Sequence, residues 1–321
     1  MKRILVPLDG SLAAEQALPT AVALSRVHES ALELLLVNQG QAAGGFETWP
    51  WAISTARNHG DYLASQADRL SERGSVVDHA MVEGRATDEI CRFAVERHVG
   101  LIVMVSRGHT GFARILGGSV ADAVVRQSRI PVLLLREMPL GRRIPKAALH
   151  IDRVLVAIDG SAESFAALDA AAELTDRGVT ELHLVEVVTP VLLAPFNAMR
   201  RLARLNHDAT QLAVDHAVAQ LDALAERVAA RTGCDVYPHV MIHEDPARAI
   251  LRTARGFNAS VIAMGTHGRG ASRLFMGSVA ERVRGDGRYP MLIVHPPETA
   301  MSPDQQRWDL EEERDPSLRS G

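Results

Sequence analysis

The stretch MGTHGRGASRLFMGSVAERV, residues 264–283, has a composition suited to holding an anion. Gly265 and Gly268 lack a Cβ atom, so a ligand can approach their backbone N–H groups closely. Gly277 and Ser278 precede an apolar pattern with helical spacing, and the start of a helix offers N–H donors and a partial positive charge. We therefore interpret this stretch as a candidate phosphate loop.

Two further side chains in the stretch can take part in the same chemistry. Arg269 would add a positive charge beside a phosphate, and His267 could contact phosphate or act as an acid–base group. A simpler interpretation stands beside this one, because glycines after a strand often only form a turn. Ser278 can likewise cap a helix without any ligand. The stretch by itself leaves both interpretations open.

The chain repeats itself, and the candidate loop has a twin in the first half. The matching segments are ILVPLDGS (4–11) and VLVAIDGS (154–161), LIVMVSRGHTGFARILGGSVADAV (101–124) and VIAMGTHGRGASRLFMGSVAERV (261–283), and RIPVLLL (129–135) and RYPMLIV (288–294). The matches occur in the same order in both halves. We therefore predict a first domain over 1–136, a linker over 137–151, a second domain over 152–297 and an acidic, disordered tail over 298–321.

Each copy alternates short apolar runs with segments of helical pattern. The runs in the first copy are typical of buried parallel strands and lie at 3–8, 32–37, 75–82, 101–105 and 131–135. Ser11 is expected to cap a helix that extends to about residue 27. The predicted fold class is α/β, with two repeated doubly wound domains, each a five-stranded parallel sheet in the order 3-2-1-4-5 with helices on both faces.

That strand order defines where a ligand would bind. An open parallel sheet binds ligands beyond the carboxyl ends of its strands, where the strand order reverses, here between strands 1 and 4. Asp159 follows strand 1 of the second copy and the glycine stretch follows strand 4, so both are expected at one crevice. Asp159 can accept hydrogen bonds from a ribose or an adenine amino group, or it can simply fix the Asp-Gly-Ser turn. The occurrence of the same arrangement in both copies favours a nucleotide site.

The motifs at these positions match a known family. They are the Asp-Gly-Ser sequences after strand 1, Gly-Thr-His-Gly at 265–268, Gly-Ser-Val-Ala at 277–280 and the prolines that begin the last strands. In this combination the chain resembles a tandem universal stress protein, with the resemblance covering 1–136 and 152–297. The resemblance implies a stress-response protein with a regulatory or protective rather than metabolic role. The family contains members that bind ATP and members that do not.

ATP-binding members carry the pattern G-x2-G-x9-G-(S/T), and each copy departs from it once. The second copy keeps every motif residue but has eight residues between the second and third glycines. The first copy keeps the spacing but has Val105 at the first glycine position; its other motif residues are Gly108, Gly118 and Ser119. A β-branched side chain hinders the approach of a ligand to the backbone, whereas a glycine-rich loop can absorb one missing residue. We therefore expect the nucleotide in the second copy and a degenerate site in the first.

The resemblance implies two more roles at the crevice. In ATP binders the backbone of a valine at the end of strand 2 meets the adenine, and Val187 occupies this position. Before its third helix the second copy has Glu244, where the family often has glycine, and a carboxylate facing the crevice would repel phosphate. The predicted nucleotide-binding residues are Asp159, Val187, Met264, Gly265, His267, Gly268, Arg269, Gly277, Ser278 and Val279. The weaker second site comprises Asp9, Gly108, Gly118 and Ser119, and the expected cofactor is ATP, with or without Mg²⁺.

Composition restricts the other function classes. The net charge is −4, and the tail from 298 carries seven acidic and three basic residues, so the rest of the chain is near neutral and no nucleic-acid partner is expected. No run of about 18 apolar residues is present, so we expect no membrane span and a cytoplasmic protein. The two cysteines are far apart and suggest buried thiols rather than a disulfide. His239 and His243, four residues apart, are interpreted as surface histidines rather than metal ligands.

Three hypotheses remain open at this stage. The first is an adenine nucleotide-binding stress protein, whose two domains pack as an internal pseudo-dimer through the last strands 131–135 and 290–294, with a homodimer as a further option. The second is an interaction protein of the same fold with no ligand in either half. The third is a weak ATPase, which the sequence favours least because it offers no evident base or metal cluster beyond Asp159 and His267.

Overall fold

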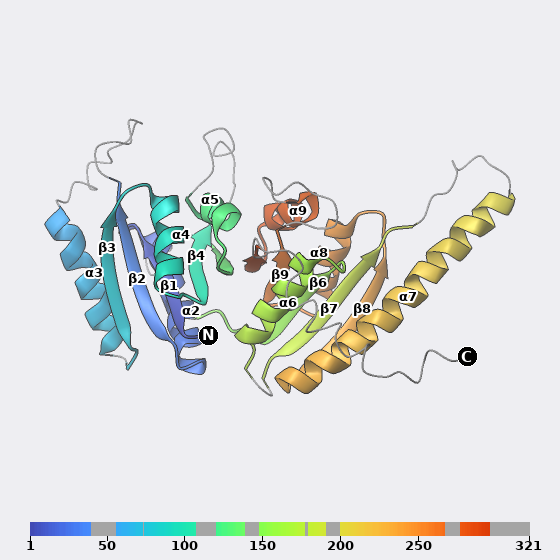
Figure 1. The fold of residues 1–321 in the computed structure, drawn as a ribbon, viewed down its shortest axis with the longest axis horizontal. Coiled ribbons are helices and arrows are strands. Elements are labelled where there is room, and N and C mark those ends of the chain that lie inside the picture. The colour runs from blue at the N-terminus through green and yellow to red at the C-terminus, as the bar shows by residue number, and fades with distance from the viewer. Residues whose placement is uncertain are drawn as a thin grey trace. The chain divides into compact units, whose positions relative to one another are not determined.

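The computed structural model describes residues 1–39, 56–72, 74–106, 120–138, 148–176, 179–190, 200–266 and 277–295, with the backbone alone at 56–58 and 200–205. The predicted tail and most of the predicted linker lie outside the described residues. Two compact units make up the chain, one formed by Met1–His150 with Gly285–Ile293 and the other by Ile151–Arg284 with Val294–Gly321. Figure 1 shows the helices and strands of both units.

The first unit contains a parallel sheet in the order β3-β2-β1-β4-β5, which confirms the predicted topology. Figure 1 labels β3, β2, β1 and β4 of this sheet. Its elements are β1 (Arg3–Leu8), α1 (Leu12–Glu15), α2 (Ala17–Val27), β2 (Ala31–Asn38), α3 (Ala56–Ser71), β3 (Val77–Glu83), α4 (Ala86–Glu96), β4 (Leu101–Ser106), α5 (Val120–Gln127) and β5 (Val132–Arg136). The central strands β1 and β4 are buried along almost their whole length because helices cover both faces, so they read as continuous apolar runs.

The helix after β1 differs from the prediction. One continuous helix to about residue 27 was expected, but the chain forms α1, a turn at Gln16 and then α2. Pro19 explains the interruption, because it has no N–H to donate to the carbonyl of Glu15 and its ring crowds that carbonyl. The side-chain amide of Gln16 also bonds the backbone of Met138, donating to the carbonyl oxygen at 3.1 Å and accepting from the N–H at 2.8 Å.

The second unit repeats the same central order. Its elements are β6 (Arg153–Ile158), α6 (Ala162–Leu174), β7 (Glu181–Val188), α7 (Arg200–Thr232), β8 (Asp235–Ile242), α8 (Pro246–Gly256), β9 (Val261–Gly265) and α9 (Ser278–Asp286). Strand β6 lies between β7 and β9, and β8 lies beyond β7, all in parallel. Here the helix after the first strand is uninterrupted, because Asp169 stands where the first copy has proline.

The last strand, β10 (Met291–Val294), is paired with β5 in the antiparallel direction. The register joins Met291 to Leu134 and Ile293 to Val132. This pairing was expected, because an uncovered strand at the edge of a sheet needs a neighbour. The domain boundaries and the pseudo-twofold packing of the two domains stay predictions.

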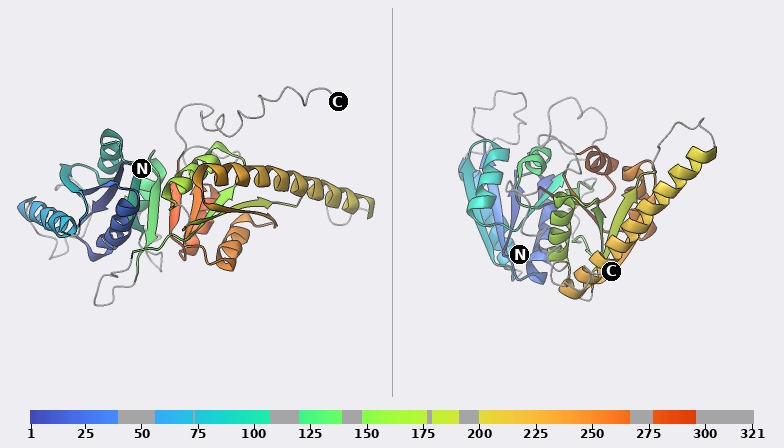
Figure 2. Two further views of the ribbon diagram at one scale, coloured as in Figure 1. Left: turned by 90° about the horizontal axis from the view of Figure 1, so that it is seen from below. Right: turned by 45° about the vertical axis from the view of Figure 1, so that its right-hand side comes forward.

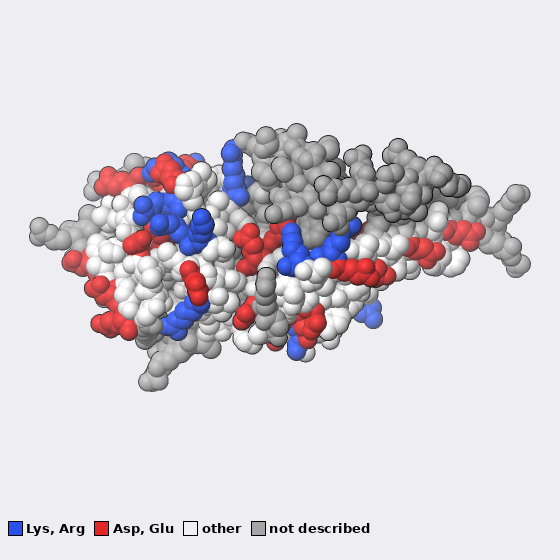
Figure 3. All heavy atoms as spheres, turned by 60° about the horizontal axis from the view of Figure 1, so that its bottom comes forward, with Lys and Arg blue, Asp and Glu red and all other residues white. Residues whose placement is uncertain are grey.

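Helix α7 is longer than its counterpart α3 and runs past the end of the strands that it covers, as Figures 1 and 2 show. Among its residues from 206 onward, the first buried one is Ala217 and the last is Thr232, while Leu212 is exposed. Charges of both signs are interspersed over the described residues of the face in Figure 3, and no broad field of one sign is visible there.

Candidate functional site

A pocket of about 510 Å³ lies in the second unit at the predicted crevice. The carboxyl ends of β6, β7 and β9 form its floor, and residues of α6, α8 and α9 complete its walls. The volume falls within the range of about 300–1,000 Å³ that is usual for small-molecule sites. The position is the one at which doubly wound sheets bind their ligands.

The structure brings together every predicted nucleotide-binding residue that it describes. They all line this pocket of the second unit: Asp159, Val187, Met264, Gly265, Gly277, Ser278 and Val279. His267, Gly268 and Arg269 lie outside the described residues. The sequence reasoning missed other lining residues, among them Glu186, Ile250 and Thr266. Of these, Thr266 lies within the Gly-Thr-His-Gly motif and Glu186 is next to Val187, whereas Ile250 is near neither.

Asp159 fixes the turn between β6 and α6. Its Oδ1 accepts hydrogen bonds from the N–H of Ser161 at 3.0 Å and from the hydroxyl of Ser161 at 2.5 Å. Gly160 between them has a φ of +74°, a left-handed conformation that glycine adopts without strain. Ser161 in turn caps α6 by accepting from the N–H of Ser164 at 3.2 Å. Because both bonds go to Oδ1, Oδ2 of Asp159 can still accept from a ligand.

Packing requires glycine at position 265, and the sequence did not reveal this requirement. A Cβ atom at this position would lie 2.6 Å from Cβ of Glu163 and 2.8 Å from its carbonyl carbon. The end of β9 therefore approaches the first turn of α6 so closely that only glycine fits. The predicted reason, access of a ligand to the backbone N–H, remains compatible with this geometry but is not needed to explain the residue.

The described ends of the glycine stretch are tied together through Thr266, which is fully buried. Its carbonyl oxygen accepts from the N–H of Gly277 at 2.6 Å, and its N–H donates to the carbonyl of Val294 at 3.0 Å. Its hydroxyl lies 3.0 Å from Nδ1 of His295. The N–H of Gly277 is thus engaged within the protein. The donors at this helix start that can meet an anion are those of the residues after it, beginning with Ser278.

An acidic pair, Glu244 and Asp245, directly precedes α8, and Glu244 stands where the family pattern has glycine. Glu244 is exposed, while Asp245 caps α8 by accepting from the N–H of Arg248 at 3.2 Å. Arg282 of α9 donates to the other oxygen of Asp245 at 2.5 Å. This bond and that from Arg248 hold the pKa of Asp245 below its usual value. The neighbouring Pro246 lines the pocket, so the ion pair links the two helices that border the pocket's entrance.

The corresponding pocket of the first unit is smaller, at about 240 Å³. Asp9 and Val105 both line it, and Oδ1 of Asp9 accepts from the N–H of Ser11 at 2.9 Å, as in the second copy. The valine therefore does face the crevice, as the sequence suggested. Gly108, Gly118 and Ser119 lie outside the described residues.

Two negative findings concern the described part of the chain. Within it, no helix is both long enough and apolar enough to cross a bilayer. Also within it, no three side chains of the metal-ligating types come together as a site. His239 and His243 do not form a pair: His239 approaches His183, and Nδ1 of His243 accepts from the N–H of Asp245 at 2.8 Å.

Comparison with known proteins identifies the same fold and repeat. The family model described as the universal stress protein family matches residues 1–136 and 150–295. Universal stress protein Rv1996 of Mycobacterium tuberculosis is 28% identical over 327 residues, covering 94% of this chain and 97% of that protein. The crystal structure of a universal stress protein from Archaeoglobus fulgidus covers 92% of this chain and 97% of its own, at 23% identity and a TM-score of 0.66. The crystal structure of a universal stress protein in complex with cAMP covers 42% of this chain and 95% of its own, at 22% identity and a TM-score of 0.34.

Proposed function

The chain belongs to the universal stress protein family, with two such domains in tandem, and from this premise we propose that it is a stress-response protein that binds ATP in its second unit. The observation that carries the proposal is the pocket of about 510 Å³, which all seven described candidate residues line together. Its output is regulatory or protective, because the residues at hand are suited to binding rather than to turnover.

The pocket offers a different environment to each part of the nucleotide. Apolar side chains such as Val185, Val187 and Ile250 line the part over β7, and they suit a flat adenine ring. Asp159 at the end of β6 suits the ribose hydroxyl groups, which can donate to Oδ2. The start of α9 suits the phosphates, since Ser278 supplies a hydroxyl and the first turn supplies N–H donors and a partial positive charge.

Mg²⁺ would support ATP in this pocket. Two carboxylates, Asp159 and Glu186, belong to its lining, and the described lining contains no lysine or arginine. Negative charges close to a triphosphate oppose its binding. A divalent cation bound with the phosphates would offset that repulsion, and its natural ligands are oxygen atoms of this kind. We therefore expect ATP affinity to be higher with Mg²⁺ than with EDTA.

A matched pair of substitutions tests the proposal. Val279→Asp adds a carboxylate in the first turn of α9, at the phosphate end of the pocket, and Val120→Asp makes the same change in the first turn of α5. Aspartate is favourable at a helix start, so both variants should fold. We expect Val279→Asp to weaken ATP binding by calorimetry about tenfold or more, since one like charge nearby costs at least about 1.4 kcal/mol. Adenosine, which has no phosphate, should bind both variants alike.

The outcomes separate the possible sites. Loss of ATP binding in Val120→Asp alone would place the nucleotide in the first unit. The proposal would be disproved if the wild-type protein binds no ATP at millimolar concentration, whether Mg²⁺ or EDTA is present. The remaining candidate would then be a ligand-free interaction protein of the same fold. Two observations favour that candidate: packing against Glu163 already explains Gly265, and the N–H of Gly277 is already bonded to Thr266.

A further inference from the structure

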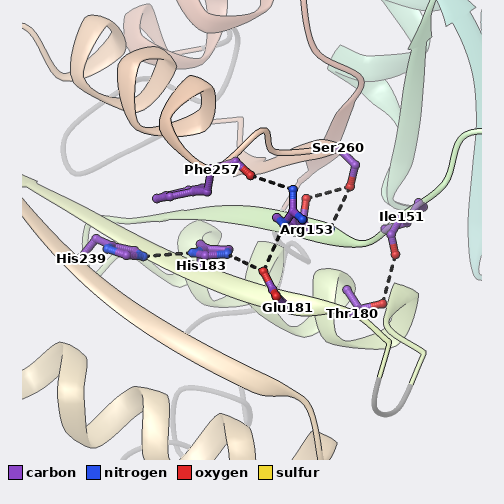
Figure 4. A network of polar contacts seen from close by, with 8 residues as sticks. All are labelled: Ile151, Arg153, Thr180, Glu181, His183, His239, Phe257 and Ser260. Carbon is purple, nitrogen blue, oxygen red and sulfur yellow. Dashed lines mark hydrogen bonds and ion pairs between the residues drawn. The ribbon is translucent and has the colours of Figure 1, made fainter.

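Two histidines on neighbouring strands form a hydrogen-bonded pair away from the pocket. Nδ1 of His183 on β7 lies 3.0 Å from Nε2 of His239 on β8 (Figure 4). The ring of Phe257 stacks on both, with centroid distances of 4.0 Å to His183 and 4.9 Å to His239. Tyr237 stacks on His183 at 5.1 Å. We call His183, His239 and Phe257 the histidine stack.

A chain of polar contacts fixes the tautomers of the pair. Arg153 on β6 donates to Oε2 of Glu181 at 3.2 Å, and the same oxygen lies 3.4 Å from Nε2 of His183 (Figure 4). An ionised carboxylate only accepts, so Nε2 of His183 carries the proton and its Nδ1 accepts from Nε2–H of His239. When both histidines are neutral, the ring nitrogen that can still accept a proton is therefore Nδ1 of His239. His239 is half-buried, so a proton from solvent enters the network at that atom.

The equivalent place in the first unit has different chemistry. Glu33 stands where the second copy has His183, and Arg97 stands where it has Phe257. Glu33 is buried and accepts from Arg97 at 2.7 Å and from Arg3 at 3.2 Å. That cluster pairs one carboxyl group with two guanidinium groups. Only the second unit places groups here that titrate between about pH 5 and 8.

The histidine stack has a direct structural connection to the pocket. His183, Val185 and Val187 alternate along β7 and so share one face, and the two valines line the pocket. Helix α8 covers that face. Pro246 and Ile250 in its first half line the pocket, and Phe257, the residue after its last turn, stacks on the histidines. One helix of 11 residues therefore contacts the ligand site at one end and the histidine stack at the other.

We propose that the histidine stack is an acid-sensitive element that controls the nucleotide pocket of the second unit through α8. The proposal rests on the nucleotide-binding function proposed above for this pocket. When the two histidines are neutral, the stack holds the end of α8 and the pocket is competent. When the pair is fully protonated, it separates and releases that end of the helix, and nucleotide affinity falls.

The number of protons decides the response. One added proton leaves a donor and an acceptor between the rings, whereas a second leaves two N–H groups facing each other at 3.0 Å, so the bond must break. Burial lowers the pKa of both histidines, and the proximity of His183 lowers that of His239 further. For His183 the Glu181 carboxylate opposes this shift and Arg153 adds to it. The transition therefore lies below the ordinary histidine pKa of about 6.5.

Other charged groups surround the stack. Asp235 on β8 is the register partner of Glu181, and Arg252 and Arg255 on α8 are exposed. The carbonyl of Phe257, at the negative end of α8, accepts from Arg153 at 3.2 Å. Histidine is the side-chain type in this set whose reference pKa lies between 5.5 and 7.5.

ATP affinity of the full chain at pH 7.5 and 5.5 tests the proposal, with His239→Gln as the main variant. Glutamine can still donate an amide N–H to His183 but cannot take up a proton. Acidification should lower the ATP affinity of both proteins. We expect the factor by which it falls to be at least about five times greater in wild type than in His239→Gln, because coupling between two sites is typically of this size. The protonation of ATP itself cancels in this comparison. His207→Gln, an exposed position on α7, is the matched control and should behave as wild type.

A second measurement does not depend on nucleotide. Amide hydrogen exchange of α8, corrected for the intrinsic effect of pH, should become faster at pH 5.5 in wild type but not in His239→Gln or His183→Gln. If ATP binds with the same pH dependence in wild type and His239→Gln, the proposal is wrong while the nucleotide function stands. If no ATP binds at pH 7.5, the nucleotide function fails, and exchange in α8 alone decides whether the stack is acid-sensitive. Exchange that is equal at both pH values would overturn the proposal.

Discussion

Replacing Gly265 by alanine tests whether packing or ligand access accounts for this glycine. The added Cβ would lie 2.6 Å from Cβ of Glu163 and 2.8–2.9 Å from its carbonyl carbon and oxygen. Two of these three atoms are backbone, so α6 or the end of β9 must shift. Overpacking of this kind typically costs about 1–3 kcal/mol of unfolding free energy. For a domain of this size the cost corresponds to a fall in Tm of roughly 2–12 °C.

The assay is thermal and urea unfolding of nucleotide-free protein, followed by circular dichroism. Gly256→Ala is the matched control, because Gly256 is the last residue of α8 and an added Cβ there would meet no atom within 4 Å. Alanine favours helix, so we expect this control to be unchanged or stabilised by up to about 1 kcal/mol. The two variants add the same methyl group to the same unit and differ only in what it meets.

One result would refute the reasoning. If Gly265→Ala unfolds at the wild-type temperature but no longer binds ATP, the glycine serves the ligand and the close approach of Glu163 has no energetic consequence. If stability falls and ATP affinity at a permissive temperature is retained, the glycine is a packing requirement. The G-x2-G signature would then be weak evidence for nucleotide binding in this chain.

Three more predictions concern the stability of the protein against unfolding. Ser161→Ala removes the cap that accepts from Ser164 and should cost about 1 kcal/mol, measured as a lower urea midpoint. Glu33→Gln leaves the buried site without its carboxylate and should cost about 1–3 kcal/mol, less than for a fully buried pair because both arginines are partly exposed. Unfolding free energy should fall as pH drops below about 6.5, since His183 and His239 protonate more readily in the unfolded chain; the fall should be smaller in His239→Gln.

Sequence reasoning found those features that depend on pattern and order. The apolar runs and the repeat locate the strands, and the right-handed crossover rule limits the strand orders that are possible. Pattern does not report distances between side chains. The clash that requires glycine at 265 depends on how closely α6 crosses the end of β9, and no residue spacing encodes that distance. The break in the helix at Gln16 could have been predicted, because Pro19 stands four residues after Glu15 in the expected helix.

The histidine stack was missed for a different reason. The sequence drew attention to His239 together with His243, because they are four residues apart, but 13 Å or so separates such positions along a strand. The true partner, His183, is 56 residues away in the chain and is brought close by the register of β7 and β8. A register error of one residue would have turned its ring to the other face of the sheet. Pairs of this kind follow from strand register and cannot be inferred from spacing in the chain.

The two copies have diverged at both ends of the sheet. At the carboxyl ends of the strands, Gly265 in the second copy corresponds to Val105 in the first, and the pocket of the first is about 240 Å³ against about 510 Å³. Near the other end of the second strand, His183 corresponds to Glu33. The copy with the larger pocket is therefore also the copy with the titratable stack, joined to that pocket by α8. A ligand site and a control element are useful only in the same unit, and this coincidence is the reason to test them together.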